Sequence, residues 1–444
     1  MKAIKNISIY TGGEKPKFIK DGVIVWSKDK IIKIVEKGFD ENSFNGEIVD
    51  GKNKLLIPGL IIAHDHLYSA LARGIKIKSN NPRNFYEILD KLWWKLDLAL
   101  DKESVYYSAL VGLIDAVRSG VTTIIDHHAS FGYILGSLDE IERASTEIGI
   151  RLSTCFEVSD RWGEEKAKES IKENLRSIEK NINRKDGMIV PTFGLHALFT
   201  IGEKTLKECS EIGNHFKVAF HVHLAEDRFD RDYNLKLYNL SPVERLLKEN
   251  MLNQKTLLIH CVHVDRNDLE IIKENNSIVI HNPESNMNNA VGLPDIFELL
   301  KKGILVGLGS DGFTQDLIRE AQVLYVAHKH NQLNSNVGFS ESNKIVFLNN
   351  PKIVERIFNY KIGVIEEGAK ADLVILDYIP PTPLDQDNFF GHFIFGLSSR
   401  FVSDVIINGD FILKDRVFTK IDEKKVLKES EVIAKNLWER FNLL

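Results

Sequence analysis

Residues of the types that hold a divalent metal ion end several separate apolar runs of this sequence. His64 and His66 close LLIPGLIIAHDH, His223 and Glu226 close VAFHVHLAE, and Asp311 ends ILVGLGSD. Imidazole nitrogens and carboxylates are common metal ligands in proteins. A metal held in this way turns water into a nucleophile at neutral pH, so the pattern predicts hydrolytic chemistry.

The histidines are predicted to be ligands from their positions on strands. Side chains alternate along a strand, so His64 and His66 point to one face and Asp65 to the other. His223 would supply a third imidazole. His221 has the same parity and is a rival ligand, but His223 is preferred because it stands at the end of its run, three residues before Glu226.

Two carboxylates complete the predicted chemistry. Glu226 can reach over the bound water and shuttle a proton to a leaving nitrogen, although a solvent-facing loop carboxylate is the alternative. Asp311 could complete the metal shell and accept the proton of the water, or it could be a turn residue before Gly312. The buried character of ILVGLG favours the functional interpretation, because a carboxylate after such a strand needs a cation or hydrogen-bond donors.

Further histidines end other apolar runs. His196, His260 and His281 could bind substrate or polarise the carbon under attack, with a structural histidine as the alternative for each. His127 and His128 follow VTTIID, and one of them must leave the inner face because neighbouring side chains alternate. The roles of His221 and of His263 stay open.

The elements that must position these residues alternate between strand and helix. The eight apolar runs are LLIPGLIIAH, VTTIID, IRLSTCFEV, MIVPTFGLH, KVAFHVHL, TLLIHCV, SIVIHN and ILVGLGSD, with helix-patterned stretches between them. This order is typical of an α/β fold with a (β/α)8 TIM-like barrel, whose active site lies at the C-terminal rim of the strands. Trp93 and Trp94 fall in a predicted helix, and one ring could stack a flat substrate at the barrel mouth.

Both ends of the chain show β pattern outside the barrel. Residues 1–57 and 366–420 are predicted to form one small β-sandwich domain, residues 58–365 the barrel, and residues 421–444 a C-terminal amphipathic helix. Runs such as GVIVWS and ADLVILDY carry this prediction.

Composition excludes several kinds of partner and compartment. A net charge of −5 argues against nucleic-acid and anionic-membrane partners, which need concentrated positive surface. No apolar run approaches the ~20 residues of a membrane span. Three cysteines cannot form a disulfide framework and no signal peptide opens the chain, so we expect a cytoplasmic protein.

The motifs resemble the amidohydrolase superfamily, in the branch of chlorohydrolases and deaminases. PGLIIAHDHLYSALARG is similar to the first-strand motif of this branch, and HLAE, IHCVH, HNPESNMNNAVG and GLGSDG follow in the right order. NFYEILDKLWWKLD and TTIIDHHAS resemble SsnA-type aminohydrolases more closely. The resemblance extends over nearly the whole chain.

The resemblance implies zinc or iron held by His64, His66, His223 and Asp311, with zinc preferred. Glu226 would be the proton shuttle, His260 would polarise the substrate or bind the metal-bound hydroxide, and His196 and His281 would be candidate substrate contacts. Two-metal members use a carboxylated lysine at the end of the fourth strand, and MIVPTFGLHALFT has no lysine, so one ion is expected.

The predicted function is hydrolysis of a carbon–nitrogen bond in a small cyclic or heteroaromatic molecule, as in an aminohydrolase or deaminase. Hydrolysis of a cyclic amide or ureide and dehalogenation are the enzymatic alternatives, because the same activated water serves all three. A catalytically silent scaffold is the alternative from another class. By analogy with relatives we expect a homo-oligomer, in the form of a dimer.

Overall fold

The apolar runs of the sequence form the parallel strands of a barrel in the computed structural model, which describes residues 1–78 and 80–444. The strands form two sheets, in the orders β6-β7-β8-β9 and β10-β11-β12-β13-β14. β9 and β10 are two halves of one strand, separated at Thr192. A parallel bridge between Asp65 and Asp311 joins the outer strands and closes the barrel. The strands are β6 (Leu60–Asp65), β7 (Val121–Asp126), β8 (Arg151–Thr154), β9 (Ile189–Pro191), β10 (Phe193–Ala197), β11 (Phe220–Leu224), β12 (Leu257–His260), β13 (Ile278–His281) and β14 (Leu305–Leu308).

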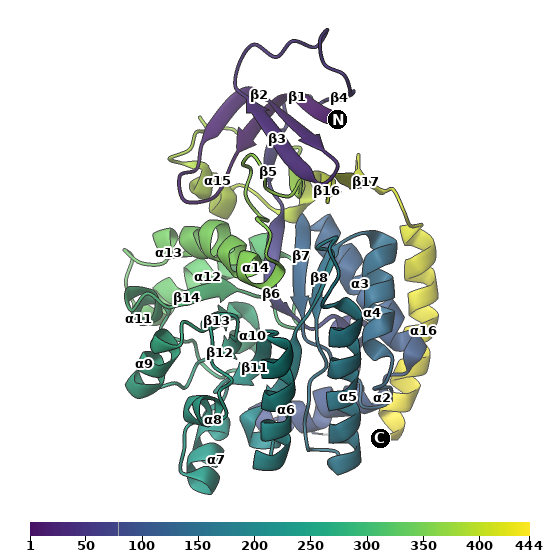
Figure 1. The fold of residues 1–444 in the computed structure, drawn as a ribbon, viewed down its shortest axis with the longest axis vertical. Coiled ribbons are helices and arrows are strands. Elements are labelled where there is room, and N and C mark those ends of the chain that lie inside the picture. The colour runs from purple at the N-terminus through teal and green to yellow at the C-terminus, as the bar shows by residue number, and fades with distance from the viewer. Residues whose placement is uncertain (79) are drawn as a thin grey trace.

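Helices surround these strands, as the predicted α/β barrel requires (Figure 1). The predicted fold class is confirmed. The helices are α1 (Phe85–Ile88), α2 (Trp94–Ala99), α3 (Lys102–Arg118), α4 (Ser137–Ile148), α5 (Glu164–Asn181), α6 (Glu203–Phe216), α7 (Arg228–Tyr238), α8 (Pro242–Lys248), α9 (Arg266–Glu274), α10 (Pro283–Asn288), α11 (Ile296–Lys301), α12 (Leu317–Gln332), α13 (Phe339–Lys344), α14 (Asn350–Phe358), α15 (Phe389–Phe395) and α16 (Glu423–Leu443).

The barrel interior is apolar at one end and polar at the other. Leu257 and Ile278, the first residues of β12 and β13, belong to one buried apolar cluster with Ile61 and Ile259 and with Ile353 of α14. Because all the strands are parallel, their carboxyl ends meet at the opposite rim. The polar residues that follow the strands therefore converge there.

The two ends of the chain form one sheet beside the barrel. This nine-stranded sheet has the order β18-β17-β16-β15-β5-β1-β2-β3, with β4 paired to β1. Figure 1 shows the early, purple strands next to the late, yellow-green ones. The residue boundaries assigned to the domains stay a prediction. The strands are β1 (Lys2–Tyr10), β2 (Phe18–Ser27), β3 (Lys30–Val35), β4 (Glu47–Asp50), β5 (Leu55–Pro58), β15 (Leu373–Leu376), β16 (Val402–Ile407), β17 (Asp410–Lys414) and β18 (Val417–Phe418).

A buried ion pair connects this sheet to the barrel. Arg151 of β8 donates two hydrogen bonds to Asp372, of 2.9 and 3.0 Å, and both side chains are fully buried. The paired geometry satisfies a charge that would otherwise be costly in the interior.

The C-terminal helix supports the loop that follows the first barrel strand. α16 lies along α3 on the outside of the barrel (Figure 1). Trp438 donates a hydrogen bond from Nε1 to the carbonyl of Leu71, at 2.8 Å, in the short helix η1 (Leu67–Ala72).

In the described part of the chain, no helix is long and apolar enough to cross a membrane.

The remaining short turns lie near the barrel mouth and along the later helices. The stretch that carries the two tryptophans was predicted as one helix, but α1 and α2 are separated by a π-helical turn. This turn is η2 (Leu89–Trp93), and the other short helices are η3 (Leu198–Thr200), η4 (Ile345–Asn349) and η5 (Ser399–Phe401).

Candidate active site

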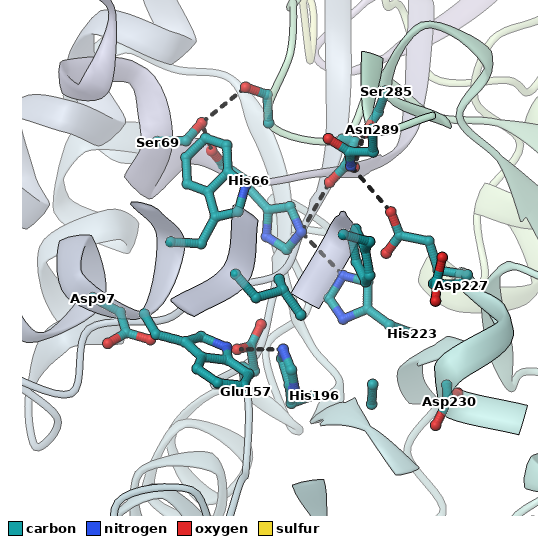
Figure 2. A pocket seen from close by; sticks show the side chains of 18 of the residues that line it. His66, Ser69, Asp97, Glu157, His196, His223, Asp227, Asp230, Ser285 and Asn289 are labelled. Atoms are coloured by element: carbon teal, nitrogen blue, oxygen red, sulfur yellow. Dashed lines mark hydrogen bonds and ion pairs between the residues drawn. The ribbon is translucent and has the colours of Figure 1, made fainter. Parts of the chain in front are cut away.

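Four predicted ligands meet at the C-terminal rim of the barrel. One ligand atom from each of His64, His66, His223 and Asp311 lies within 4.8 Å of the others, and all four residues are buried. Nε2 of His66 lies 3.1 Å from Nε2 of His223 and 3.0 Å from Oδ1 of Asp311. Figure 2 shows the rings of His66 and His223 facing one another. The structure thus brings together residues separated by almost 250 positions in the chain.

The protonation pattern of these residues fits a divalent cation. Nδ1 of His66 lies 2.6 Å from the carbonyl of His127, which can only accept, so Nδ1 carries the proton and Nε2 turns a lone pair toward His223. Nε2 of His64 is buried without a hydrogen-bond partner. Three imidazole nitrogens and one carboxylate suit zinc and similar first-row metals.

A strand irregularity turns His64 into the barrel. The pairing of β6 with β7 shifts by one residue between Ile62 and Asp65. Such a bulge exchanges the faces to which the following side chains point. His64 therefore faces the barrel interior, while Asp65 accepts hydrogen bonds from Ser310, at 2.6 Å, and from Gln315.

His221, the rival ligand, lies behind His64. Its Nε2 is 2.8 Å from Nδ1 of His64, and its Nδ1 is 3.8 Å from Sγ of Cys155. If His64 presents the Nε2 lone pair to a cation, its Nδ1 proton is donated to His221. This contact orients the ring of His64 in the way that supporting residues orient metal ligands.

Glu226, His260 and Asp311 form an overlapping group beside the four ligands. Their ligand atoms also lie within 4.8 Å of one another, and Oε2 of Glu226 is 3.3 Å from Nε2 of His260. Asn289 donates a hydrogen bond of 3.2 Å to Oε1 of Glu226. Asn286 lies on the far side of His260, with its amide nitrogen 2.8 Å from Nδ1.

The pKa values of the two carboxylic acids of this group are shifted in opposite directions. Burial, and then the charge of Asp311, raise the pKa of Glu226 well above its usual value. Burial opposes the ionisation of Asp311, but its contacts with His64 and His66 hold the pKa of Asp311 well below its usual range. A proton donor thus stands beside a proton acceptor, which is the arrangement that acid–base catalysis requires.

The other predicted substrate contacts have different placements. His196 lines the cavity in front of the ligands. His281 is fully buried with Nε2 3.0 Å from Nε2 of His328 on α12, so the structure does not bring it to the cavity. Its parity explains this placement: Ile278 and Ile280 of β13 face the barrel interior, so His281 faces the surrounding helices.

His127 and His128, which follow one another after β7, point in opposite directions, as the alternation of side chains along a strand requires. His127 points inward, with Nε2 3.2 Å from the carbonyl of His221, whereas His128 points outward to Ser130 at 2.7 Å. His263 lies with Nε2 2.9 Å from the carbonyl of Val291.

Strained backbone accompanies the site. Ala225, His260, Cys261 and Asp311 all have positive φ angles, between 47° and 73°. Such conformations are costly for residues other than glycine and concentrate at functional sites. At His260 the left-handed backbone ends the regular alternation of β12, and the ring lies next to Glu226.

A cavity with an empty volume of about 870 Å³, its open mouth included, extends from the ligands to the surface. Its aromatic wall includes both predicted tryptophans, and the aromatic lining residues are Tyr68, Phe85, Trp93, Trp94, Phe199, Phe229 and Phe313. Five charged residues that the sequence interpretation missed also line it: Asp97, Glu157, Arg161, Asp227 and Asp230. The available signal was Glu157 itself, which lies in the third apolar run with the inward parity of Cys155.

Comparison with known proteins agrees with this geometry. The pattern of the amidohydrolase family matches residues 55–412. The chain belongs to the amidohydrolase family. This amidohydrolase is 30% identical over 436 residues to the 5'-deoxyadenosine deaminase of Methanocaldococcus jannaschii, covering 97% of this chain and 98% of that protein. It is also 30% identical to the 5-methylthioadenosine/S-adenosylhomocysteine deaminase of Thermoanaerobacter pseudethanolicus, covering 98% and 99% of the two chains.

Solved structures share the fold of this amidohydrolase at lower identity. An adenosine deaminase from Xanthomonas campestris with bound zinc has a TM-score of 0.85 and 18% identity, covering 100% of this chain and 99% of that one. An atrazine chlorohydrolase from Arthrobacter aurescens complexed with zinc has a TM-score of 0.83 and 19% identity, covering 98% and 100%.

These findings confirm the predicted family and enzyme class. The amidohydrolase is a metal-dependent hydrolase of carbon–nitrogen bonds other than peptide bonds. Its cofactor is a divalent metal and its substrate is a small molecule.

Proposed function

We propose that this amidohydrolase is a deaminase of a flat nitrogen heterocycle that uses one zinc ion. Water replaces an exocyclic amino group on a ring carbon, and ammonia leaves. The observation that carries the proposal is the shared Asp311: it belongs both to the group that can hold a metal and to the group with Glu226 and His260. The deaminases among the relatives and the aromatic walls of the cavity support it.

His64, His66, His223 and Asp311 would hold the ion. When bound, a divalent metal lowers the pKa of water from ~16 toward ~7 and acts as a Lewis acid. Zinc is preferred because three imidazoles and one carboxylate are a usual zinc ligand set. The zinc named in two structures of the same fold supports this choice.

The surrounding residues move the protons. Asp311, which is ionised, accepts a proton from the attacking water. Glu226, whose pKa is raised by burial, donates a proton to the ring nitrogen next to the carbon under attack. The proton taken up by Asp311 then passes to the departing amino group, so that ammonia leaves as a neutral molecule. Glu226 regains a proton from the hydroxyl group on the ring carbon as that group becomes a carbonyl.

His260 is proposed to stabilise the oxygen that is added to the ring carbon. The amide of Asn286 donates to Nδ1 of His260, so the proton of the neutral ring resides on Nε2. Nε2 is buried without a hydrogen-bond partner and lies on the side of Glu226. It is therefore free to donate to charge that develops on the substrate.

A cytoplasmic location is proposed from the thiols. The three cysteines of the described chain are free and buried, as expected where disulfides do not form. The homo-oligomer stays a prediction.

Ammonia release tests the proposed reaction. Zinc-loaded protein should release ammonia from at least one member of a panel of aminopurines, aminopyrimidines and aminopterins, and protein stripped by a chelator should not. The same panel with chlorotriazines and cyclic ureides, read by chloride release and by ring opening, tests the alternatives. Chloride release or ring opening without any ammonia would overturn deamination.

A further inference from the structure

An acid–base network lies on the cavity wall, and the proton transfers described above do not use it. Arg161 donates hydrogen bonds from Nη2 to Asp97, at 2.5 Å, and to Oε1 of Glu157, at 2.9 Å. All three side chains line the cavity and are at most 6% exposed. Figure 2 shows Glu157 beside His196, with Asp97 further from the ligands.

The network lies close to the reacting centre. A carboxylate oxygen of Glu157 and one ring nitrogen from each of His66, His127 and His223 lie within 4.8 Å of one another. A second metal ion at this position would lie next to the Arg161 guanidinium, which already bonds Glu157, and two positive charges in a buried site repel strongly. Glu157 is therefore better placed to contact substrate than to hold another ion.

The two histidines that face Glu157 turn hydrogen-bond acceptors toward it. Nε2 of His127 faces the carbonyl of His221 and must donate to it, so Nδ1 of the neutral ring, 3.5 Å from Oε2 of Glu157, has no proton to give. The hydroxyl of Thr200 donates to the carbonyl of Ala197 and accepts from Nδ1 of His196 at 2.9 Å. Nε2 of His196 thus also presents a lone pair, 3.7 Å from Oε1 of Glu157.

Burial keeps these acceptors without protons. The pKa of His196 falls to about 3 because the charged ring would lose its hydration. The Arg161 guanidinium, which donates a hydrogen bond of 2.9 Å to Oε1 of Glu157, favours the ionised carboxylate. A substrate that enters here meets a carboxylate and an imidazole lone pair.

The side chains of the cavity wall carry more negative than positive charge. Arg161 is the one lysine or arginine among the described residues that line it; Asp97 and Glu157 both bond its Nη2, whereas its Nε and Nη1 are buried without a hydrogen-bond partner. Its guanidinium lies 4.4 Å from the ring of Phe131 and 5.7 Å from that of Trp94, which fixes its plane. Other acids line the same cavity: Glu226, Asp227, Asp230 and Asp311.

We propose that Glu157 binds an N–H edge of the substrate, with Arg161 and Asp97 as its positioning residues. The substrate is accordingly a flat nitrogen heterocycle with adjacent N–H donors that is neutral or positively charged and carries no phosphate or carboxylate. The proposal rests on the proposed function for the reaction that follows, and it specifies the substrate class of that same site.

Equilibrium binding to a protein that does not turn over tests this proposal. Zinc-loaded Glu226→Gln protein is titrated by calorimetry with two matched pairs of probes: pterin against pterin-6-carboxylate, and adenosine against adenosine 5'-monophosphate. We expect at least one neutral probe to bind about 10-fold or more tightly than its anionic partner, the factor that corresponds to one unpaired polar contact. Equal or tighter binding of both anionic partners, or binding of none of the probes, would overturn the proposal.

Two variants that each remove one negative charge test whether Glu157 itself binds the neutral probe. In the Glu226→Gln protein, Glu157→Gln should weaken the neutral probe by about 10- to 100-fold, the range for hydrogen bonds to a charged group, with zinc content unchanged. Asp227→Asn removes the same charge at the cavity mouth and keeps its capping bond to the backbone of Phe229, so it should leave the affinity unchanged.

An equal loss in both variants would mean that only the net charge matters, and Glu157 would lose its role. If Glu157→Gln does not fold, the comparison of neutral and anionic probes still decides the substrate class. If the binding experiments contradict the substrate class, ammonia release by the wild-type protein still tests the proposed deamination by itself. If the neutral probes bind but no ammonia is released, only the proposed deamination is overturned.

Discussion

Replacement of Glu226 by glutamine should stop turnover while the metal stays bound. The glutamine side chain has the same shape and keeps an oxygen that can accept the hydrogen bond from Asn289, now 3.2 Å long. It cannot donate a proton in the way the carboxyl does. Glu226 is not one of the four residues expected to hold the ion, so the ion should not be lost.

The expected magnitude follows from the loss of one positioned proton donor. General acid catalysis contributes ~10²- to 10⁴-fold to the rate. A decrease of this size in kcat corresponds to about 2.7 to 5.5 kcal/mol of activation free energy. KM should change much less, because Glu226 acts on the transition state.

Ammonia release and metal content by mass spectrometry are measured on the same samples, with Asp227→Asn as the neighbouring control. Both variants should hold as much zinc as the wild type, and only Glu226→Gln should lose turnover. Full activity in Glu226→Gln would refute the assigned role, and loss of zinc would show that Glu226 is a ligand and not a proton donor.

Three further predictions concern parts of the structure around the site. Asp372→Asn should lower the free energy of unfolding by about 3–5 kcal/mol in chemical denaturation, because it leaves Arg151 buried without its countercharge. Glu431→Gln, which removes an exposed ion pair, is the control that should leave the free energy of unfolding nearly unchanged, and equally small losses in both variants would contradict the prediction. Gly309→Ala should weaken zinc binding by about 10-fold or more in a competition assay, because an added Cβ would lie 2.8 Å from the carbonyl oxygen of His64, and Gly391→Ala, which meets no atom within 4 Å, is the control that should bind normally. Burial raises the pKa of Tyr10 from 10.0 to about 12, so the stability this residue contributes is complete below pH 10 and is lost as the pH rises toward 12, by at most about 2–3 kcal/mol. Tyr10→Phe should therefore show a shallower loss of unfolding free energy between these pH values, and an unchanged slope would be the contrary result.

The barrel could be predicted because each strand is a short apolar run that ends in polar residues. Eight such runs alternate with helical patterns, and the parallel order of the strands brings their ends to one rim. The candidate ligands could be named because imidazoles and a carboxylate stand at those ends. His64, His66, His223 and Asp311 therefore needed only the strand order to be placed together.

Features that depend on local backbone geometry could not be predicted. In a regular strand, residues two positions apart point to the same face. A bulge in β6, between Ile62 and Asp65, shifts the pairing by one residue, so that His64 does not point to the face that regular alternation from the start of the strand would give it. His281 was predicted to contact the substrate because it ends a run, and its outward parity turns it to His328 instead. The π-helical turn between α1 and α2 likewise has no signature in the helical spacing of their residues.

The charged network of the cavity was missed for a different reason. Asp97, Glu157 and Arg161 come from two separate regions of the chain, and only the folded barrel brings them together. A single acid in an apolar run predicts little without its partners. Their pairing on the cavity wall is a property of the tertiary structure.

Diffraction from crystals of the zinc-loaded protein at the zinc absorption edge tests the central claim most directly. The claim predicts one anomalous peak at bonding distance, about 2.0–2.2 Å, from nitrogen atoms of His64, His66 and His223 and from an oxygen of Asp311. A peak centred between His127 and Glu157, or no peak at the barrel rim in protein that is active, would contradict it.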